Sequence, residues 1–192
     1  MTLKYYQDNA QTFFDGTVNV DMSSLYETFT KHLAPGARVL DAGCGSGRDA
    51  KAFLEMGYQV EAFDASSAMV ELARKHTGLP VQLMTFADVD WKEKFDGIWC
   101  CASLLHVPAG ELPGVMRKLA DALKPGGAWY LSFKYGDGER EVDGRRFTDM
   151  DEGRLQAFLN TVAMIDVISL WATQDKRPLR NEVWINGVLR KE

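Results

Sequence analysis

A chain of 192 residues with 46% hydrophobic and 26% charged residues has the size and composition of one globular domain. No run of 18 apolar residues is present and the N-terminus lacks an apolar signal segment, so we expect neither a membrane span nor export, and hence a cytoplasmic location. The net charge of −5 disfavours an extended nucleic-acid surface. Three cysteines, two of them adjacent, make a poor disulfide framework, and no cysteine–histidine spacing resembles a zinc site.

Two short amphipathic helices are predicted at the start of the chain. Apolar residues recur at helical spacing over 4–14 and again over roughly 21–33. Gly16 ends the first of these segments. We therefore expect both helices to precede the first strand and to pack one face against the domain.

Residues 38–50 combine a strand, a glycine-rich loop and the start of a helix. The apolar strand follows a Pro-Gly pair, three glycines then alternate, and a helical pattern begins at Arg48. Such a loop lets a ligand approach the backbone, and the helix start offers free N–H groups. Read from Gly45, the spacing also permits a dinucleotide fingerprint ending in alanine. Asp41 argues against that, because a carboxylate there would repel a pyrophosphate; it favours a ligand with a cationic group.

The nine residues at 39–47, Val-Leu-Asp-Ala-Gly-Cys-Gly-Ser-Gly, resemble motif I of the class I S-adenosylmethionine-dependent methyltransferases. The family form is hydrophobic-Leu-Asp-x-Gly-x-Gly-x-Gly, and every position is met. A second family mark, Leu-Lys-Pro-Gly-Gly at 123–127, stands before a predicted strand. The order of elements resembles the family over nearly the whole chain. The small single-domain layout is also loosely similar to tellurite-resistance-type bacterial methyltransferases.

This resemblance implies an α/β fold: a Rossmann-like, doubly wound sheet of seven mostly parallel strands, with an antiparallel last strand and helices on both faces. Alternating or apolar segments place the strands that follow the first at 58–64, 81–85, 95–102, 128–133, 162–171 and 182–190. Helices are expected over 66–76, 110–123 and 149–160. One methyltransferase domain would span 1–192, with residues 1–34 as a helical lid.

The resemblance also implies a cofactor site at the strand ends. Asp41 would receive the ammonium group of S-adenosylmethionine, and Arg48 its carboxylate. Asp64 closes the second strand, where an acidic residue can accept from both ribose hydroxyls of any adenosine ligand. The remaining cofactor candidates are Tyr5, Gly43, Cys44, Gly45, Ala65, Ala87, Asp88 and Ala102, with Ala87 and Asp88 placed at the adenine edge.

Candidate acceptor groups come from three further segments. Tyr6 lies in the expected lid and is a candidate catalytic residue, and His106 follows the fourth strand with a side chain suited to general-base work. The polar, glycine-rich segment 134–150 is predicted to be a flexible loop over the acceptor side. Its three arginines at 140, 145 and 146 are candidate contacts for an anionic acceptor.

The sequence therefore predicts an enzyme that transfers a methyl group from S-adenosylmethionine to a small molecule by in-line displacement, releasing S-adenosylhomocysteine. No metal is required, and no appended domain suggests a protein or nucleic-acid target. Two alternatives remain open: a non-catalytic S-adenosylmethionine-binding regulator, and an NAD(P)-dependent oxidoreductase. Asp64 permits the oxidoreductase, whereas Asp41 and the Leu-Lys-Pro-Gly-Gly segment do not suit it.

Overall fold

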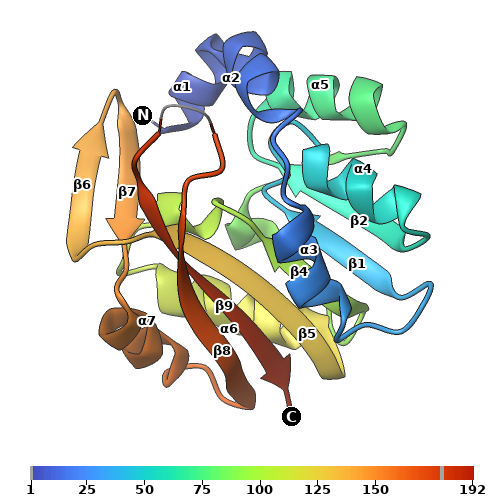
Figure 1. Ribbon diagram of the computed structural model, residues 1–192, viewed down its shortest axis with the longest axis vertical. Helices are drawn as coiled ribbons and strands as arrows, with labels where there is room; N and C mark the ends of the chain where they lie inside the picture. Colours follow the sequence, from blue (N-terminus) through green and yellow to red (C-terminus); the bar gives the residue numbers. More distant parts are fainter. Residues whose placement is uncertain (1, 178–179) are drawn as a thin grey trace.

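A seven-stranded sheet forms the centre of the computed structural model, which describes residues 2–177 and 180–192 (Figure 1). Its strands are β1 (Arg38–Ala42), β2 (Gln59–Asp64), β3 (Gln82–Leu83), β4 (Phe95–Cys100), β5 (Leu123–Lys134), β8 (Ile165–Gln174) and β9 (Val183–Lys191). Their order is β3-β2-β1-β4-β5-β9-β8. The first five are mutually parallel, and β9 runs antiparallel to both β5 and β8. The predicted mixed sheet with an antiparallel last strand is confirmed.

Helices cover both faces of this sheet. The α-helices are α1 (Thr2–Asp8), α2 (Ala10–Thr17), α3 (Ser23–Thr30), α4 (Arg48–Glu55), α5 (Ser67–Thr77), α6 (Leu112–Ala122) and α7 (Glu152–Leu159), with short 3-10 turns η1 (Phe86–Asp88) and η2 (Leu104–His106). Alternate residues of β1 explain the two layers. Val39 belongs to the core cluster that includes residues of α3, α4 and α5, whereas Leu40 belongs to the cluster that includes residues of α6 and α7. Both side chains are fully buried.

The N-terminal helices lie at one end of the sheet, between α5 and the strands that follow β5 (Figure 1). The single helix predicted over 4–14 is two helices, because Asn9 leaves the helical conformation and its side-chain amide donates to the carbonyl of Tyr5. Gln7 ties α1 to α5: its Oε1 accepts from the Ser66 and Ser67 hydroxyls. Among the described residues, no helix is long and apolar enough to span a bilayer.

Segment 134–150 differs from its prediction. Instead of a flexible loop it forms an antiparallel hairpin, β6 (Gly138–Val142) and β7 (Arg145–Asp149). Asp143 and Gly144 make the two-residue turn, with φ values of 52° and 71°. That conformation is typical of a type I′ turn, for which Asp-Gly is a preferred sequence. The hairpin is anchored to α1, because the amide of Arg146 donates to the hydroxyl of Thr2 at 2.9 Å.

Candidate functional site

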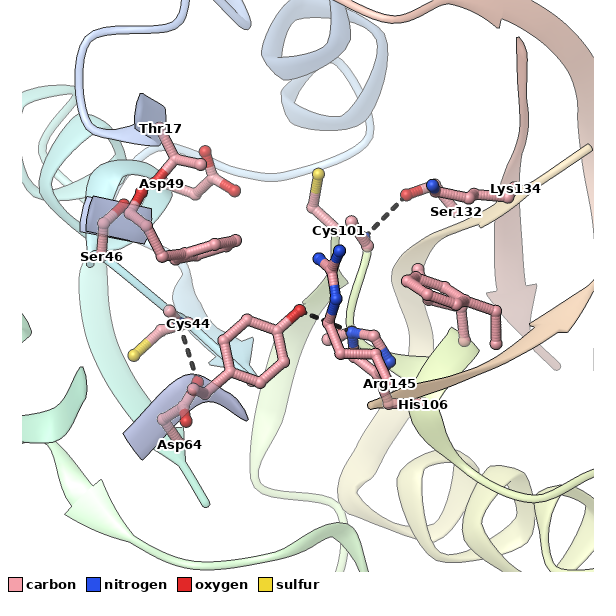
Figure 2. Close-up of a pocket in the computed structure, with 18 of the residues that line it drawn as sticks. Thr17, Cys44, Ser46, Asp49, Asp64, Cys101, His106, Ser132, Lys134 and Arg145 are labelled. Atoms are coloured by element: carbon pink, nitrogen blue, oxygen red, sulfur yellow. Dashed lines mark hydrogen bonds between the residues drawn. The ribbon is translucent and has the colours of Figure 1, made fainter. Parts of the chain in front are cut away.

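A cavity of about 570 Å³ lies beyond the carboxyl ends of the parallel strands. Its wall is built from the glycine loop, the ends of β2 and β4, the N-terminal helices, the hairpin and described residues between β8 and β9. In Figure 2, Cys44, Ser46 and Asp64 lie on one side of this space and Ser132 and Lys134 on the other. This end of an open parallel sheet is where ligands bind in doubly wound folds.

Most of the predicted site residues meet at this cavity. Ten line it: Tyr6, Gly43, Cys44, Gly45, Arg48, Asp64, Ala65, Ala87, Ala102 and His106. The other three, Tyr5, Asp41 and Asp88, are not among the described lining residues. Asp88 is exposed, and its carboxylate accepts from the amide and hydroxyl of Thr85. Its predicted contact with adenine stays a prediction.

The glycine loop joins the ends of two strands. Gly43 has φ of +77°, and a Cβ there would come within 2.6 Å of the Cβ of Ser103, just after β4. Ser103 in turn donates its hydroxyl to the carbonyl of Ala42 at 2.7 Å. Glycine is therefore needed at 43 both for its backbone conformation and for this close approach.

Asp64 holds the loop from the neighbouring strand. One carboxylate oxygen accepts from the amide of Gly45 and the other from the amide of Ser66, each at 2.9 Å. Burial raises the pKa of Asp64, while these amides favour its ionised form. Each oxygen has two lone-pair directions, so both oxygens keep accepting capacity toward the cavity.

A second carboxylate, on Asp49 next to the loop, accepts a network of hydrogen bonds that the sequence did not predict. Oδ1 accepts from the Tyr26 hydroxyl and Arg48 Nε, and Oδ2 from Trp99 Nε1 and Arg48 Nη2. Burial alone would raise the pKa of Asp49, but the Arg48 guanidinium and these donors hold it below its usual value. A carboxylate in the first turn of α4 is the available sequence signal for it.

The pKa of Asp41 shifts in the opposite direction. Burial, and then the charge of Asp49, raise its pKa well above the usual range. Its side chain accepts from the amide of Ala50 at 3.0 Å and lies behind the loop. A carboxyl whose pKa is raised ionises less readily, and its neutral form attracts an ammonium group less than the ionised form does. Its predicted cofactor contact therefore stays a prediction, without support from this placement.

Tyr6 and His106 form a hydrogen-bonded pair on the cavity wall (Figure 2). The carbonyl of Arg146 can only accept, so His106 Nδ1, 2.7 Å away, carries the proton. Nε2 then accepts from the Tyr6 hydroxyl at 2.7 Å. Burial lowers the pKa of His106 to about 4 and raises that of Tyr6 to about 12. Near neutral pH both groups are uncharged, with the histidine lone pair directed at the tyrosine.

The three hairpin arginines separate in the structure. Arg140 pairs with Asp149, and Arg146 pairs with Glu139 at 3.4 Å. Arg145 lies on the cavity wall, with its guanidinium carbon 4.1 Å from the centroid of the Tyr5 ring (Figure 2). Of the three arginines, only Arg145 is on the described cavity wall, so it remains the candidate contact for an anionic acceptor.

Aromatic and cationic wall residues near the hairpin were also missed. Phe147 is buried, and the ammonium of Lys134 lies 4.7 Å from its ring centroid. Lys134 is paired with Glu182 at 2.9 Å. Phe147 is the single apolar residue in 145–149, so the sequence holds no alternating pattern that would have identified it.

Comparisons with known proteins give matches to methyltransferases. Residues 39–127 match a family model described as a methyltransferase domain. A ubiquinone biosynthesis O-methyltransferase of Xanthomonas campestris pv. campestris (strain B100) is 37% identical over 105 residues, 51% of this chain and 43% of that protein. The match to the curated relatives thus spans less than half of their length. The family match favours the methyltransferase interpretation of the glycine loop over the oxidoreductase.

Solved structures share the whole fold. A Burkholderia thailandensis 1,6-didemethyltoxoflavin-N1-methyltransferase, with bound 1,6-didemethyltoxoflavin and S-adenosylhomocysteine, is 23% identical and covers 98% of this chain and 84% of its own, with a TM-score of 0.79. A Methanosarcina mazei SAM-dependent methyltransferase is 17% identical and covers 89% and 98%, with a TM-score of 0.75. At these identities the similarity shows the architecture.

Proposed function

We propose that this chain, a member of the class I S-adenosylmethionine-dependent methyltransferases, transfers a methyl group to a small-molecule acceptor by direct in-line displacement. The observation that carries this proposal is one cavity that joins the glycine loop and Asp64 to the Tyr6–His106 pair. S-adenosylmethionine would be consumed and S-adenosylhomocysteine released. Helices α1 and α2, which form part of the wall, would act as a lid.

The wall residues suit the parts of this cofactor. Asp64 has accepting capacity left for the ribose hydroxyls, and Ala65, Phe86 and Ala87 line the adjacent wall, where adenine would lie. Nε and Nη2 of Arg48 donate to Asp49. Nη1 is therefore the nitrogen that would donate to the methionine carboxylate. Asp49 thereby fixes the direction of Arg48.

Bound S-adenosylmethionine supplies a methyl group already activated on a sulfonium sulfur. The chain has to position the acceptor, exclude water and take a proton. Positioning alone can lower a barrier by roughly 7–11 kcal/mol. As the new bond to the methyl carbon forms, the acceptor proton moves to the Tyr6 oxygen and the Tyr6 proton moves to His106 Nε2. The resulting imidazolium keeps its Nδ1 proton on the carbonyl of Arg146 and later loses the other to solvent.

A base that takes a proton suits a hydroxyl acceptor, since an alcohol or phenol must lose its proton as it is methylated. The curated relatives named as O-methyltransferases support an oxygen acceptor. Three free thiols, Cys44, Cys100 and Cys101, suit a reducing, cytoplasmic setting. A cavity of about 570 Å³ favours a small molecule over a nucleic acid or a protein.

Calorimetric titration with S-adenosylmethionine, S-adenosylhomocysteine and NADH tests the cofactor. We expect both sulfur ligands to bind, and Asp64→Ala to weaken them at least tenfold because two ribose hydrogen bonds to a carboxylate are lost. Asp90→Ala is the matched control: it also removes an acidic residue, but one that is exposed and is not among the described residues of the cavity wall. Binding of NADH alone would refute the proposal.

Turnover with a panel of small phenols, followed by the appearance of S-adenosylhomocysteine, tests catalysis. Tight cofactor binding without any methylated product across the panel would favour the regulatory alternative. A loss of cofactor affinity in Asp88→Ala, with none in Asp90→Ala, would support the predicted adenine contact of Asp88.

A further inference from the structure

Among the partly buried cations of the described cavity wall, Arg145 is the one without a close counter-charge. Its nearest carboxylate, on the exposed Asp143, is 3.7 Å from Nη2. Its Nε is buried and has no hydrogen-bond partner among residues 2–177 and 180–192. The other partly buried cations of the wall, Arg48, Lys134 and Arg177, each have a carboxylate oxygen within 2.9 Å.

Two aromatic rings, one from α1 and one from the hairpin, hold this guanidinium in place. The guanidinium carbon of Arg145 lies 4.1 Å from the ring centroid of Tyr5 and 5.3 Å from that of Phe147. The side chain is 20% exposed. A guanidinium fixed between aromatic rings keeps its planar fork of N–H donors oriented, so less freedom is lost when it binds a ligand.

Arg145 also lies beside the pair that would activate the acceptor. Its charge lowers the pKa of Tyr6 against the larger effect of burial, and it lowers the pKa of His106 further. An anion bound to Arg145 would therefore lie next to the Tyr6 oxygen. The same molecule can place one group on the arginine and another on the tyrosine.

We propose that Arg145 binds a carboxylate of the acceptor, so that the substrate is a small aromatic acid whose hydroxyl meets Tyr6. The inference rests on the proposed function and specifies its substrate class. A carboxylate fits better than a phosphate group, since its single negative charge matches the single charge of one guanidinium, whose fork can hold both carboxylate oxygens. A phosphate commonly takes backbone N–H groups of a helix start as well, and Arg145 stands at a hairpin turn.

Aromatic neighbours favour an aromatic scaffold. Phe147 and Trp184 line the cavity near the hairpin, together with Phe13 from α2. Rings of this kind pack well against a planar ligand. The partly buried position of Arg145 also makes an uncharged acceptor unfavourable, because the guanidinium would lose water without gaining a partner.

The test uses the full chain loaded with S-adenosylhomocysteine and titrated calorimetrically with benzoate, the three hydroxybenzoates and their methyl esters. We expect the acids to bind at least tenfold more tightly than their esters. Arg145→Gln should weaken the acids about tenfold or more and leave the esters unchanged, as expected for loss of a charge-assisted hydrogen bond. Arg140→Gln, which removes a hairpin arginine not on the described cavity wall, should leave acid binding unchanged.

Arg145→Lys provides a second test that keeps the charge and removes the fork. It should bind the acids less tightly than the wild type and more tightly than Arg145→Gln. Esters that bind as well as acids, acids that bind Arg145→Gln as well as the wild type, or acids that bind to none of these proteins would each overturn the inference. Failure of S-adenosylhomocysteine to bind the wild type would instead refute the proposed function.

Discussion

Single residues set the chemistry through burial as much as through identity. His106 and Tyr6 are ordinary side chains in the sequence, and their hydrogen bond makes one the acceptor and the other the donor. Because the backbone carbonyl of Arg146 fixes the histidine tautomer, the lone pair has one direction. Burial keeps the imidazole uncharged well below neutral pH.

The pH dependence of turnover follows from this burial. A free histidine titrates near ~6.5, whereas the pKa of His106 in the folded enzyme is about 4. The base form therefore persists as pH falls below 6.5, and we expect kcat to change little between about pH 5.5 and 8. A pH–rate profile checks this. An acid limb centred near the free-histidine value would contradict the buried, neutral histidine.

The low pKa of His106 should leave activity unchanged at mildly acidic pH but lower the stability of the folded protein there. The unfolded chain takes up a proton on His106 as pH falls through about 6.5, and the folded chain resists until about 4. The free energy of unfolding therefore decreases as pH falls through that window, and His106 contributes at most about 3 kcal/mol to the decrease. Urea unfolding of the wild type and His106→Asn should show a difference that narrows as pH falls from 7 to 4.5. A constant difference would argue against the shift.

At the level of elements, close contacts between strand ends shape the cofactor side. Gly43→Ala should destabilise the protein by about 2–4 kcal/mol, because it combines a positive φ with the contact to Ser103. Gly36→Ala is the matched control: φ is also positive, at +71°, and nothing lies within 4 Å of the added Cβ. It should cost only about 1 kcal/mol. Equal losses in urea unfolding would show that the strand contact contributes nothing.

The hairpin gives the acceptor side its rigidity. Gly144→Val should unfold it locally, because φ of +71° is strained for a β-branched residue, while the added side chain meets open space. We expect faster trypsin cleavage after the three hairpin arginines, with global unfolding by urea nearly unchanged. Gly110→Val serves as a control for cleavage elsewhere, since its φ is not positive and its surroundings are also open. Unchanged cleavage would mean that the turn does not hold the hairpin.

Elements were easier to predict than the contacts between them. Periodicity and the glycine motif identified the strands through β5, the helices between them and Asp64, because these features are local in the sequence. The role of Asp49 was not predicted, because its partners Tyr26 and Trp99 come from distant segments of the chain. The hairpin had an Asp-Gly turn signal, but its charges and glycines also suit a loop. The exclusion of Asp41 from the wall depends on three-dimensional packing alone.

For the molecule as a whole, cofactor binding should appear as thermal stability. A ligand that binds only the folded state at a hundredfold excess over its Kd adds about 2.7 kcal/mol. In a domain of this size that corresponds to a rise in Tm of about 5–10 °C. Thermal unfolding should show this shift with S-adenosylhomocysteine and lose it in Asp64→Ala. A similar shift with NADH would contradict the cofactor assignment.

Helix α1 is bonded on both sides of the cavity, through Gln7 to the start of α5 and through Thr2 to Arg146 in the hairpin. Because α1 is held at both ends, we expect the two ligands beneath it to bind and leave in a fixed order. We expect the nucleoside, which would lie deepest against the glycine loop, to arrive first and depart last. Initial-rate kinetics should then follow an ordered scheme, in which S-adenosylhomocysteine competes with S-adenosylmethionine and the methylated product does not.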